Sequence, residues 1–245
     1  MTRIEWFAVF LIVAGGAARA AEPALPTPLE LKYVLRYAGM EVGHVTKTLT
    51  READGTYVHR SQSVPEGGLR LITTVEWIEE GRFEIAKGEV RPLSFLEYRV
   101  GADKSHRHSA SFDWKNQKIH YAGWPDAALP AGTQDQGSIL YALMLKPPPA
   151  GSEQTVFVSS GKKLREYRYL EVGAETLKTI FGAVRTRIIE RRPLANDKNR
   201  DIFRVWLAPD RHNLPVRIRT EKRGQDITLD LESVNGELTP ARNPR

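Results

Sequence analysis

Hydrophobic and polar residues alternate along much of this chain. Side chains of a β-strand point in turn to its two faces, so a period of two indicates a strand with one buried face. The clearest runs are Phe203, Val205 and Leu207, the series Ile227, Leu229 and Leu231, and the series Leu69, Leu71, Thr73, Val75 and Trp77. We therefore expect short strands through most of the sequence.

Short turn sequences separate these runs, including Asp54-Gly55, Lys87-Gly88 and Arg223-Gly224. Tight turns between short strands indicate antiparallel hairpins and not crossover units. The pattern predicts a mainly all-β fold. It would be an antiparallel meander of about 10–12 strands that forms a curved sheet, a half-open barrel or a sandwich.

The register of one hairpin follows from its turn. If Arg223-Gly224 is a two-residue loop, Ile218 faces Leu229 on the inner side and Arg217 lies opposite Asp230 on the outer side. Such a cross-strand ion pair contributes roughly 0.2–1 kcal/mol, so we expect it mainly to fix the register.

Residues 134–146 (QDQGSILYALMLK) break the β pattern and predict one short amphipathic helix. Ile139, Leu140 and Leu143 share a helical face, Asp135 is the expected N-cap, and the prolines at 147–149 end the helix. A lone helix of this length is unstable in water. We expect it to lie on the sheet or across the mouth of a curved one.

The first residues have the order of an export signal. Arg3 precedes an apolar run at 6–16, and Ala18-Arg19-Ala20 is a small-x-small cleavage motif. The apolar run is shorter than the roughly 20 residues that span a bilayer, so we expect a cleavable signal peptide and no membrane span. The expected location is the periplasm. The expected segments are a signal peptide at 1–20, a proline-rich linker at 21–29, a single β domain at 30–238 and a disordered tail at 239–245.

Composition narrows the chemistry. The chain has no cysteine, which excludes thiol catalysis and thiolate metal sites, and its net charge of +6 suits weak attraction to anionic surfaces. Export would separate it from nucleic acid. No nucleophile elbow, metalloprotease helix or phosphate loop is present, so we predict no catalytic residues and no cofactor. A triad of Ser, His and Asp assembled in space stays open.

The weak metal candidates are His106, His108 and His120. His106 and His108 share a strand face, as metal ligands must. A two-residue turn at Lys115-Asn116 would place His120 on the opposite face with Ser111, whereas a shift of one residue would reverse this. The geometry is undecided, and we predict no metal site.

Aromatic residues on different strands are the candidate ligand-binding residues. They could fill the core of a closed sandwich, or line an apolar cavity in a curved sheet that a helix partly covers. The candidates are Trp77, Trp114, Tyr167, Tyr169 and Trp206.

Several segments resemble a family of exported bacterial proteins, the domain-of-unknown-function 3108 family. They are 33–43 (YVLRYAGMEVG), 91–93 (RPL), 132–140 (GTQDQGSIL), 179–185 (TIFGAVR) and 206–218 (WLAPDRHNLPVRI). The resemblance implies an exported antiparallel β protein and supplies no activity or catalytic residues. We expect a non-enzymatic periplasmic protein that binds a lipid-like or other apolar envelope ligand in a concave sheet. The alternative is an envelope protein–protein interaction module with a filled core.

Overall fold

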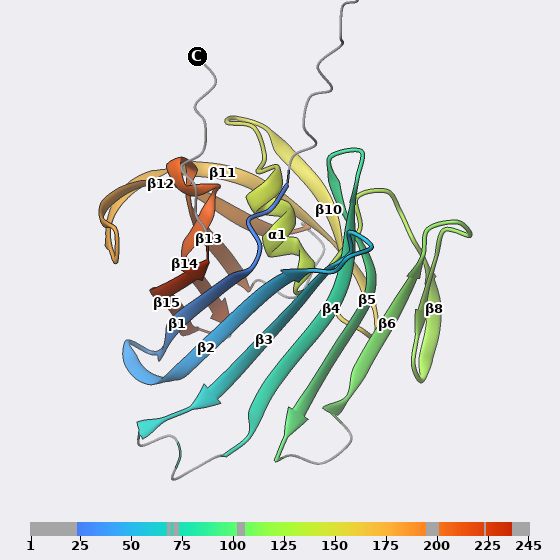
Figure 1. Ribbon diagram of the computed structural model, residues 1–245, viewed down its shortest axis with the longest axis horizontal. Coiled ribbons are helices and arrows are strands. Elements are labelled where there is room, and N and C mark those ends of the chain that lie inside the picture. The colour runs from blue at the N-terminus through green and yellow to red at the C-terminus, as the bar shows by residue number, and fades with distance from the viewer. Residues whose placement is uncertain are drawn as a thin grey trace, which may run out of the picture.

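One antiparallel β-sheet forms the framework of the protein (Figure 1). The computed structural model describes residues 24–67, 70, 74–101, 106–194, 201–222 and 224–236. Within these ranges the sheet has 15 strands, more than the alternation predicted. The strands are β1 (Leu29–Tyr37), β2 (Met40–Arg51), β3 (Tyr57–Pro65), β4 (Glu76–Ala86), β5 (Glu89–Val100), β6 (His108–Asp113), β7 (Lys118–Tyr121), β8 (Trp124–Ala128), β9 (Gln134–Asp135), β10 (Glu153–Ser159), β11 (Leu164–Thr179), β12 (Gly182–Pro193), β13 (Ile202–Ala208), β14 (Leu214–Lys222) and β15 (Gln225–Gly236).

The strand order confirms the predicted meander. It runs from β8 down to β1, crosses to β15 and continues down to β9, so that β8 and β9 are the two edges. β9 pairs with β10 in parallel and the other pairs are antiparallel. Figure 1 shows the sheet curving around the helix α1 as a half-open barrel, which we call the trough. The strands from β8 to β1 form the first arm of the trough, and those from β15 to β9 form the second arm. Ser159 of β10 donates a hydrogen bond to the Tyr121 hydroxyl of β7 at 3.3 Å, which joins the two arms.

The hairpin of β14 and β15 has the predicted register. Ile218 pairs with Leu229, and Arg217 pairs with Asp230. Arg217 Nε donates to Asp230 Oδ1 at 2.5 Å, which is the expected cross-strand ion pair.

Helix α1 (Ser138–Leu145) is shorter than the predicted helix at 134–146. Gln134 and Asp135 instead form β9, because β10 binds their backbone in a parallel bridge. The helix is not amphipathic in its surroundings, since six of its eight residues are buried. Its Tyr141 and Met144 join a core cluster that contains residues of β1–β5 as well as residues of β11 and β13–β15. The other buried apolar residues join the core of β10–β14.

Helix α1 therefore lies inside the trough and does not cover its mouth like a lid. Ile139, Leu140 and Leu143 pack with Val205 and Leu207 of β13. Burying each such side chain contributes on the order of 2 kcal/mol. This burial stabilises a helix of about two turns that would not form alone.

Some predictions concern residues outside the described ranges. These are the signal peptide at 1–20, the tail at 239–245, and Leu69, Leu71 and Thr73 of the proposed strand. β4 begins only at Glu76. In the proposed linker, Leu25 is buried and β1 begins at Leu29.

Candidate functional site

A row of polar side chains crosses the first arm of the sheet. Consecutive members of this row are direct partners in the register of β2, β3, β4, β5 and β6. Direct partners on neighbouring strands point to the same face of a sheet. We call this set the inner polar row: Lys47, Ser61, Glu79, Glu97 and His108.

The row faces the interior of the trough. His59 lies two residues before Ser61 and therefore on the same face. Its ring contacts Tyr141 of α1, with the ring centroids 5.6 Å apart. The inner polar row is thus on the face that holds the helix.

Exposure on this inner face rises with distance from α1. Beside the helix, Leu49, His59 and Phe95 are at most 2% exposed. In the inner polar row Glu79 is half-buried. Trp77, which comes two residues earlier in β4 and lies on the same face, is 37% exposed. The trough is therefore filled around α1 and open where β1 and β3 end (lower left of Figure 1). We call this the open end.

Charge in the inner polar row is partly compensated. Lys47 Nζ donates to Ser61 Oγ at 2.9 Å. Burial lowers the pKa of Lys47, while the nearby Glu79 acts in the opposite direction. Burial also lowers the pKa of His108. Lys47 and Glu79 are half-buried, whereas Ser61 and Glu97 are buried, so the row offers one ammonium group and one carboxylate to a ligand that enters from the open end.

Beneath the row lies a buried acid–base cluster of His59, Asp135 and Ser138. Their side chains are almost or completely inaccessible to solvent. His59 Nε2 is 3.8 Å from Asp135 Oδ1. The same carboxylate oxygen accepts the N–H groups of Gly137 and Ser138, each at 2.8 Å, and so satisfies donors at the start of α1.

Burial shifts both titratable groups toward their neutral forms. It raises the pKa of Asp135 to about 7, although hydrogen bonds from Ser138 and Gly137 act in the opposite direction. It lowers the pKa of His59 to about 3, and Lys47 adds to this effect. The start of α1 is therefore held by a carboxyl group that titrates near neutral pH.

The cluster contains the residue types of a hydrolase triad but not its geometry. Ser138 Oγ accepts the Asp135 N–H at 2.9 Å and donates to Gln134 Oε1 at 3.0 Å. A triad needs its serine bonded to the histidine and open to substrate. Here Ser138 is fully buried, so the arrangement supports the helix start and not nucleophilic catalysis.

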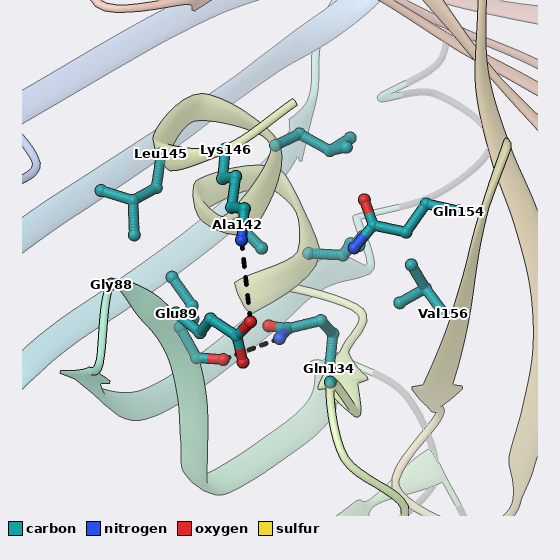
Figure 2. Close-up of a pocket in the computed structure, with 12 residues that line it drawn as sticks. Gly88, Glu89, Gln134, Ala142, Leu145, Lys146, Gln154 and Val156 are labelled. Carbon is teal, nitrogen blue, oxygen red and sulfur yellow. Dashed lines mark hydrogen bonds and ion pairs between the residues drawn. The ribbon is translucent and has the colours of Figure 1, made fainter. Parts of the chain in front are cut away.

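A small pocket lies beside α1, on the side of β5 and β10 (Figure 2). Its volume is about 70 Å³, and Ile139, Leu143 and Val156 supply apolar walls. Gln134 Nε2 donates to the Val90 carbonyl at 2.8 Å on one side. Pockets for drug-sized ligands are roughly 300–1,000 Å³, so this one could hold only a small group.

An apolar hollow lies at the open end. Leu35, Tyr37, Val42 and Ile227 line it, and its volume is about 270 Å³. Leu35 pairs with Leu229, which packs against the cores on both sides of α1, so the hollow belongs to the inner face. The inner face thus carries an apolar hollow on β1, β2 and β15 and, five residues further along β2 than Val42, Lys47 of the inner polar row.

Comparison with known proteins gives a family but no activity. The family described as "Protein of unknown function (DUF3108)" matches residues 32–232. The chain belongs to the DUF3108 family. No curated protein matches the sequence.

A solved structure gives independent support for the architecture of this DUF3108 chain. It is the crystal structure of a β-barrel-like protein of domain of unknown function DUF1849 from Brucella abortus. The TM-score is 0.54 at 12% sequence identity, over 86% of this chain and 98% of that chain. At this identity the likeness shows the fold alone.

The aromatic residues proposed to line a cavity lie in different parts of the DUF3108 chain. Tyr167 and Tyr169 are buried in the core that also contains Ile139 of α1. The guanidinium of Arg191 lies 4.4 Å from the centre of the Tyr167 ring. These two tyrosines fill space between the sheet and the helix.

The three tryptophans do not join them. Trp77 is at the open end of the inner face, with the Arg99 guanidinium 4.1 Å from its ring. Trp114 donates from Nε1 to a backbone carbonyl at 2.7 Å. Trp206, which pairs with Arg217, is buried in the core cluster that also contains Tyr141 of α1, and its Nε1 donates to Glu175 at 2.9 Å. The structure therefore brings Trp77 alone of the three near the inner polar row.

The three candidate metal ligands are also dispersed. His108 belongs to the inner polar row, whereas His120 pairs with Ser111 on the opposite face. His120 Nδ1 is 3.0 Å from Asp126 Oδ2. His106 is exposed just before β6. Among the described residues, no group of three or more His, Asp or Glu side chains is arranged to hold a metal ion.

Sequence reasoning missed the inner polar row and the acid–base cluster. Lys47, Ser61 and Glu79 occur on three different strands, and each is unremarkable in its own strand. Their alignment depends on two hairpin registers that the turn sequences did not fix. His59 and Asp135 are 76 positions apart, and only the tertiary packing of α1 unites them.

Proposed function

We propose that this DUF3108 protein is exported to the periplasm and binds an amphipathic envelope molecule without catalysis. The apolar part of the ligand would occupy the hollow at Leu35, Tyr37, Val42 and Ile227. Its polar group would contact the inner polar row. This ligand is lipid-like in character and smaller than a full-length lipid, because α1 occupies the rest of the trough.

The observation that carries this proposal is the inner polar row itself. A concave sheet face that serves only as a core buries apolar side chains, and buried charge is costly unless it is paired. Here Lys47 and Glu79 lie on the inner face and remain partly exposed. Polar groups beside an apolar wall are typical of ligand sites that fix the orientation of an amphipathic molecule.

Export supports the envelope as the source of the ligand. The motif at residues 1–20 is typical of a secretory signal peptide. Within the residues that the structure describes, no helix has the length and apolar character needed to cross a membrane.

The test is to express the full chain with its leader in a Gram-negative host and to recover it from the periplasmic fraction. Native mass spectrometry then measures the intact mass, and a solvent extract of the protein is analysed for lipids. We expect a chain that starts at Ala21 and carries a bound amphipathic molecule. Protein recovered only from the cytoplasm, or periplasmic protein with a clean apo mass and an empty extract, would contradict the proposal.

Two adjacent glutamates on β4 provide matched variants. Glu79 belongs to the inner polar row, whereas Glu80 lies on the outer face, where it forms an ion pair with Arg60. Glu79→Gln should lower the bound fraction at least threefold, and Glu80→Gln should leave it unchanged. Equal occupancy in both variants would show that the ligand does not contact the inner polar row. Circular dichroism establishes that both variants are folded.

The alternative is an envelope interaction module, which the packing of α1 inside the trough favours. Its contact would be the edge strand β8, where Trp124 is 50% exposed. An exposed edge can pair with a strand of another protein. A clean apo mass together with a Trp124→Ser-sensitive cross-link to an envelope protein in intact cells would favour this alternative.

A further inference from the structure

A second concave surface lies on the outer face of the sheet, where residues of β11–β15 and β1 line it. We call it the arginine groove, because Arg36, Arg204, Arg217 and Arg219 line it. Its volume is about 750 Å³. It is separate from the proposed ligand site in the trough.

The register places the arginine groove on the face turned away from α1. Val205 and Ile218 pair with each other and pack in the core that contains α1 residues. Arg204 and Arg219, each one position away, pair with each other on the opposite face. The same alternation places Arg217 on that face.

Arg204 and Arg219 form a direct pair of like charges. Side chains at such positions have Cβ atoms about 4.5–5.5 Å apart, and like charges directly opposite one another are destabilising. The next residue along this row is Thr228, which is uncharged. An anion bound between the two guanidinium groups would relieve the repulsion.

Two aspartates that line the groove pair with its arginines. Asp230 accepts from Arg36 at 2.7 Å through one oxygen and from Arg217 at 2.5 Å through the other. Arg219 Nε donates to Asp226 Oδ1 at 2.8 Å.

Glu190, directly opposite Arg204 in the register, accepts from both Arg204 and Arg192. Glu175 also lines the groove and accepts from Trp206 Nε1 at 2.9 Å. A guanidinium has five N–H donors, and each of these ion pairs engages only one or two of them. The four guanidinium side chains of the groove are between 33% and 38% exposed, so a dissolved ligand can reach them.

We propose that the arginine groove binds a phosphate group, with Arg204 and Arg219 as its principal ligands. Arginine pairs with phosphate oxygens through charge-assisted, often bidentate hydrogen bonds. The hydroxyl of Thr228, adjacent in the register to Arg219, is a further donor. The phosphate is either a free anion or part of a phospholipid headgroup.

The first experiment titrates the purified full chain with inorganic phosphate at constant ionic strength, using isothermal calorimetry. Chloride at the same ionic strength is the reference. We expect saturable phosphate binding that weakens at least tenfold in Arg204→Gln/Arg219→Gln. The control is Arg60→Gln, which removes an ion-paired arginine from the outer face of β3, outside the groove. It should bind phosphate like the wild-type chain.

The second experiment identifies the source of the phosphate. Co-sedimentation is measured with vesicles of phosphatidylcholine alone and of phosphatidylcholine with phosphatidylglycerol. Binding to the anionic vesicles that is lost in Arg204→Gln/Arg219→Gln would assign a headgroup, and binding of inorganic phosphate alone would assign a free anion. Absence of both, or binding that the double variant retains, would overturn the proposal. Neither result bears on the trough, because these variants leave the inner polar row intact.

Discussion

The buried carboxyl group of Asp135 should contribute to stability a pH dependence opposite to that of an ordinary aspartate. Its pKa is raised from 3.8 to about 7 by burial, so the folded chain keeps a proton that the unfolded chain releases. Between these two values the folded state binds one proton more than the unfolded state. The free energy of unfolding therefore falls as pH rises, by about 1.4 kcal/mol per pH unit. Over the whole interval the loss is about 4 kcal/mol.

His59 has the opposite effect in the wild-type chain. Its pKa is lowered from 6.5 to about 3, so the unfolded chain binds the additional proton between these values. Stability then rises with pH by the same slope, over a total of about 5 kcal/mol. From about pH 4 to pH 6.5 the two contributions of this pair nearly cancel. In the wild-type protein, neither pH dependence of the free energy of unfolding is therefore visible in this range.

The substitution Asp135→Asn separates them. Asparagine keeps an oxygen that can accept the N–H groups of Gly137 and Ser138, but it does not titrate. Urea unfolding at several pH values gives the difference in free energy between the variant and the wild-type chain, in which the other groups cancel. The variant should gain about 4 kcal/mol relative to the wild type between pH 4 and pH 7. A difference that is flat or falls over this interval would refute the protonated state of Asp135.

An exposed aspartate provides the control. The hydrogen bond from Lys118 lowers the pKa of Asp126, so its stabilisation is present above pH 3.8 and is lost as pH falls. Asp126→Asn should therefore show a small change of opposite sign, with the variant losing stability relative to the wild type as pH rises through the acid range. The same slope in both variants would point to a general effect of charge and not to burial.

Three further substitutions test the packing, each by urea unfolding. Gly137→Ala would place a Cβ 2.0 Å from Cε1 of the buried His59 ring, and should cost about 3 kcal/mol or more, with partial recovery when His59→Ala is added. Leu207→Ala should lose about 2–5 kcal/mol, because the side chain is fully buried in the core with α1; a loss below about 1 kcal/mol would contradict this packing. Tyr33→Phe should lose about 1–2 kcal/mol, because the hydroxyl donates to the buried Pro215 carbonyl at 2.9 Å, and an unchanged midpoint would count against that bond.

Local sequence patterns were sufficient to predict the meander and the register of one complete hairpin. In β14 and β15, alternating side chains and a two-residue turn act on neighbouring segments of chain, so the pairing of Arg217 with Asp230 followed from the sequence. The start of α1 could not be predicted in this way. Asp135 has the residue type of an N-cap and does accept N–H groups at the helix start, but β10 holds its backbone as a strand. That contact comes from a segment 24 residues away, and no local pattern contains it.

The candidate site depends on the registers between strands, which are set by contacts between residues far apart in the sequence. The row from Lys47 to Glu79 requires two registers in succession, and a shift of one residue in either would turn a side chain to the outer face. A β-bulge between Arg82 and Phe83 adds such a shift further along β4. Polar residues at these positions therefore look the same in sequence as those on a solvated face.

Strand β1 links the two proposed sites and limits how they can be tested. Leu35 and Tyr37 line the apolar hollow on the inner face, while Arg36 between them lines the arginine groove on the outer face. A substitution in this segment would disturb both surfaces through one backbone. The trough is therefore tested on β4 with Glu79, and the groove on β13 and β14 with Arg204 and Arg219. If ligand binding in the trough were lost in the Arg204→Gln/Arg219→Gln chain, the two faces would be coupled through the sheet, whereas independent losses would establish two separate sites.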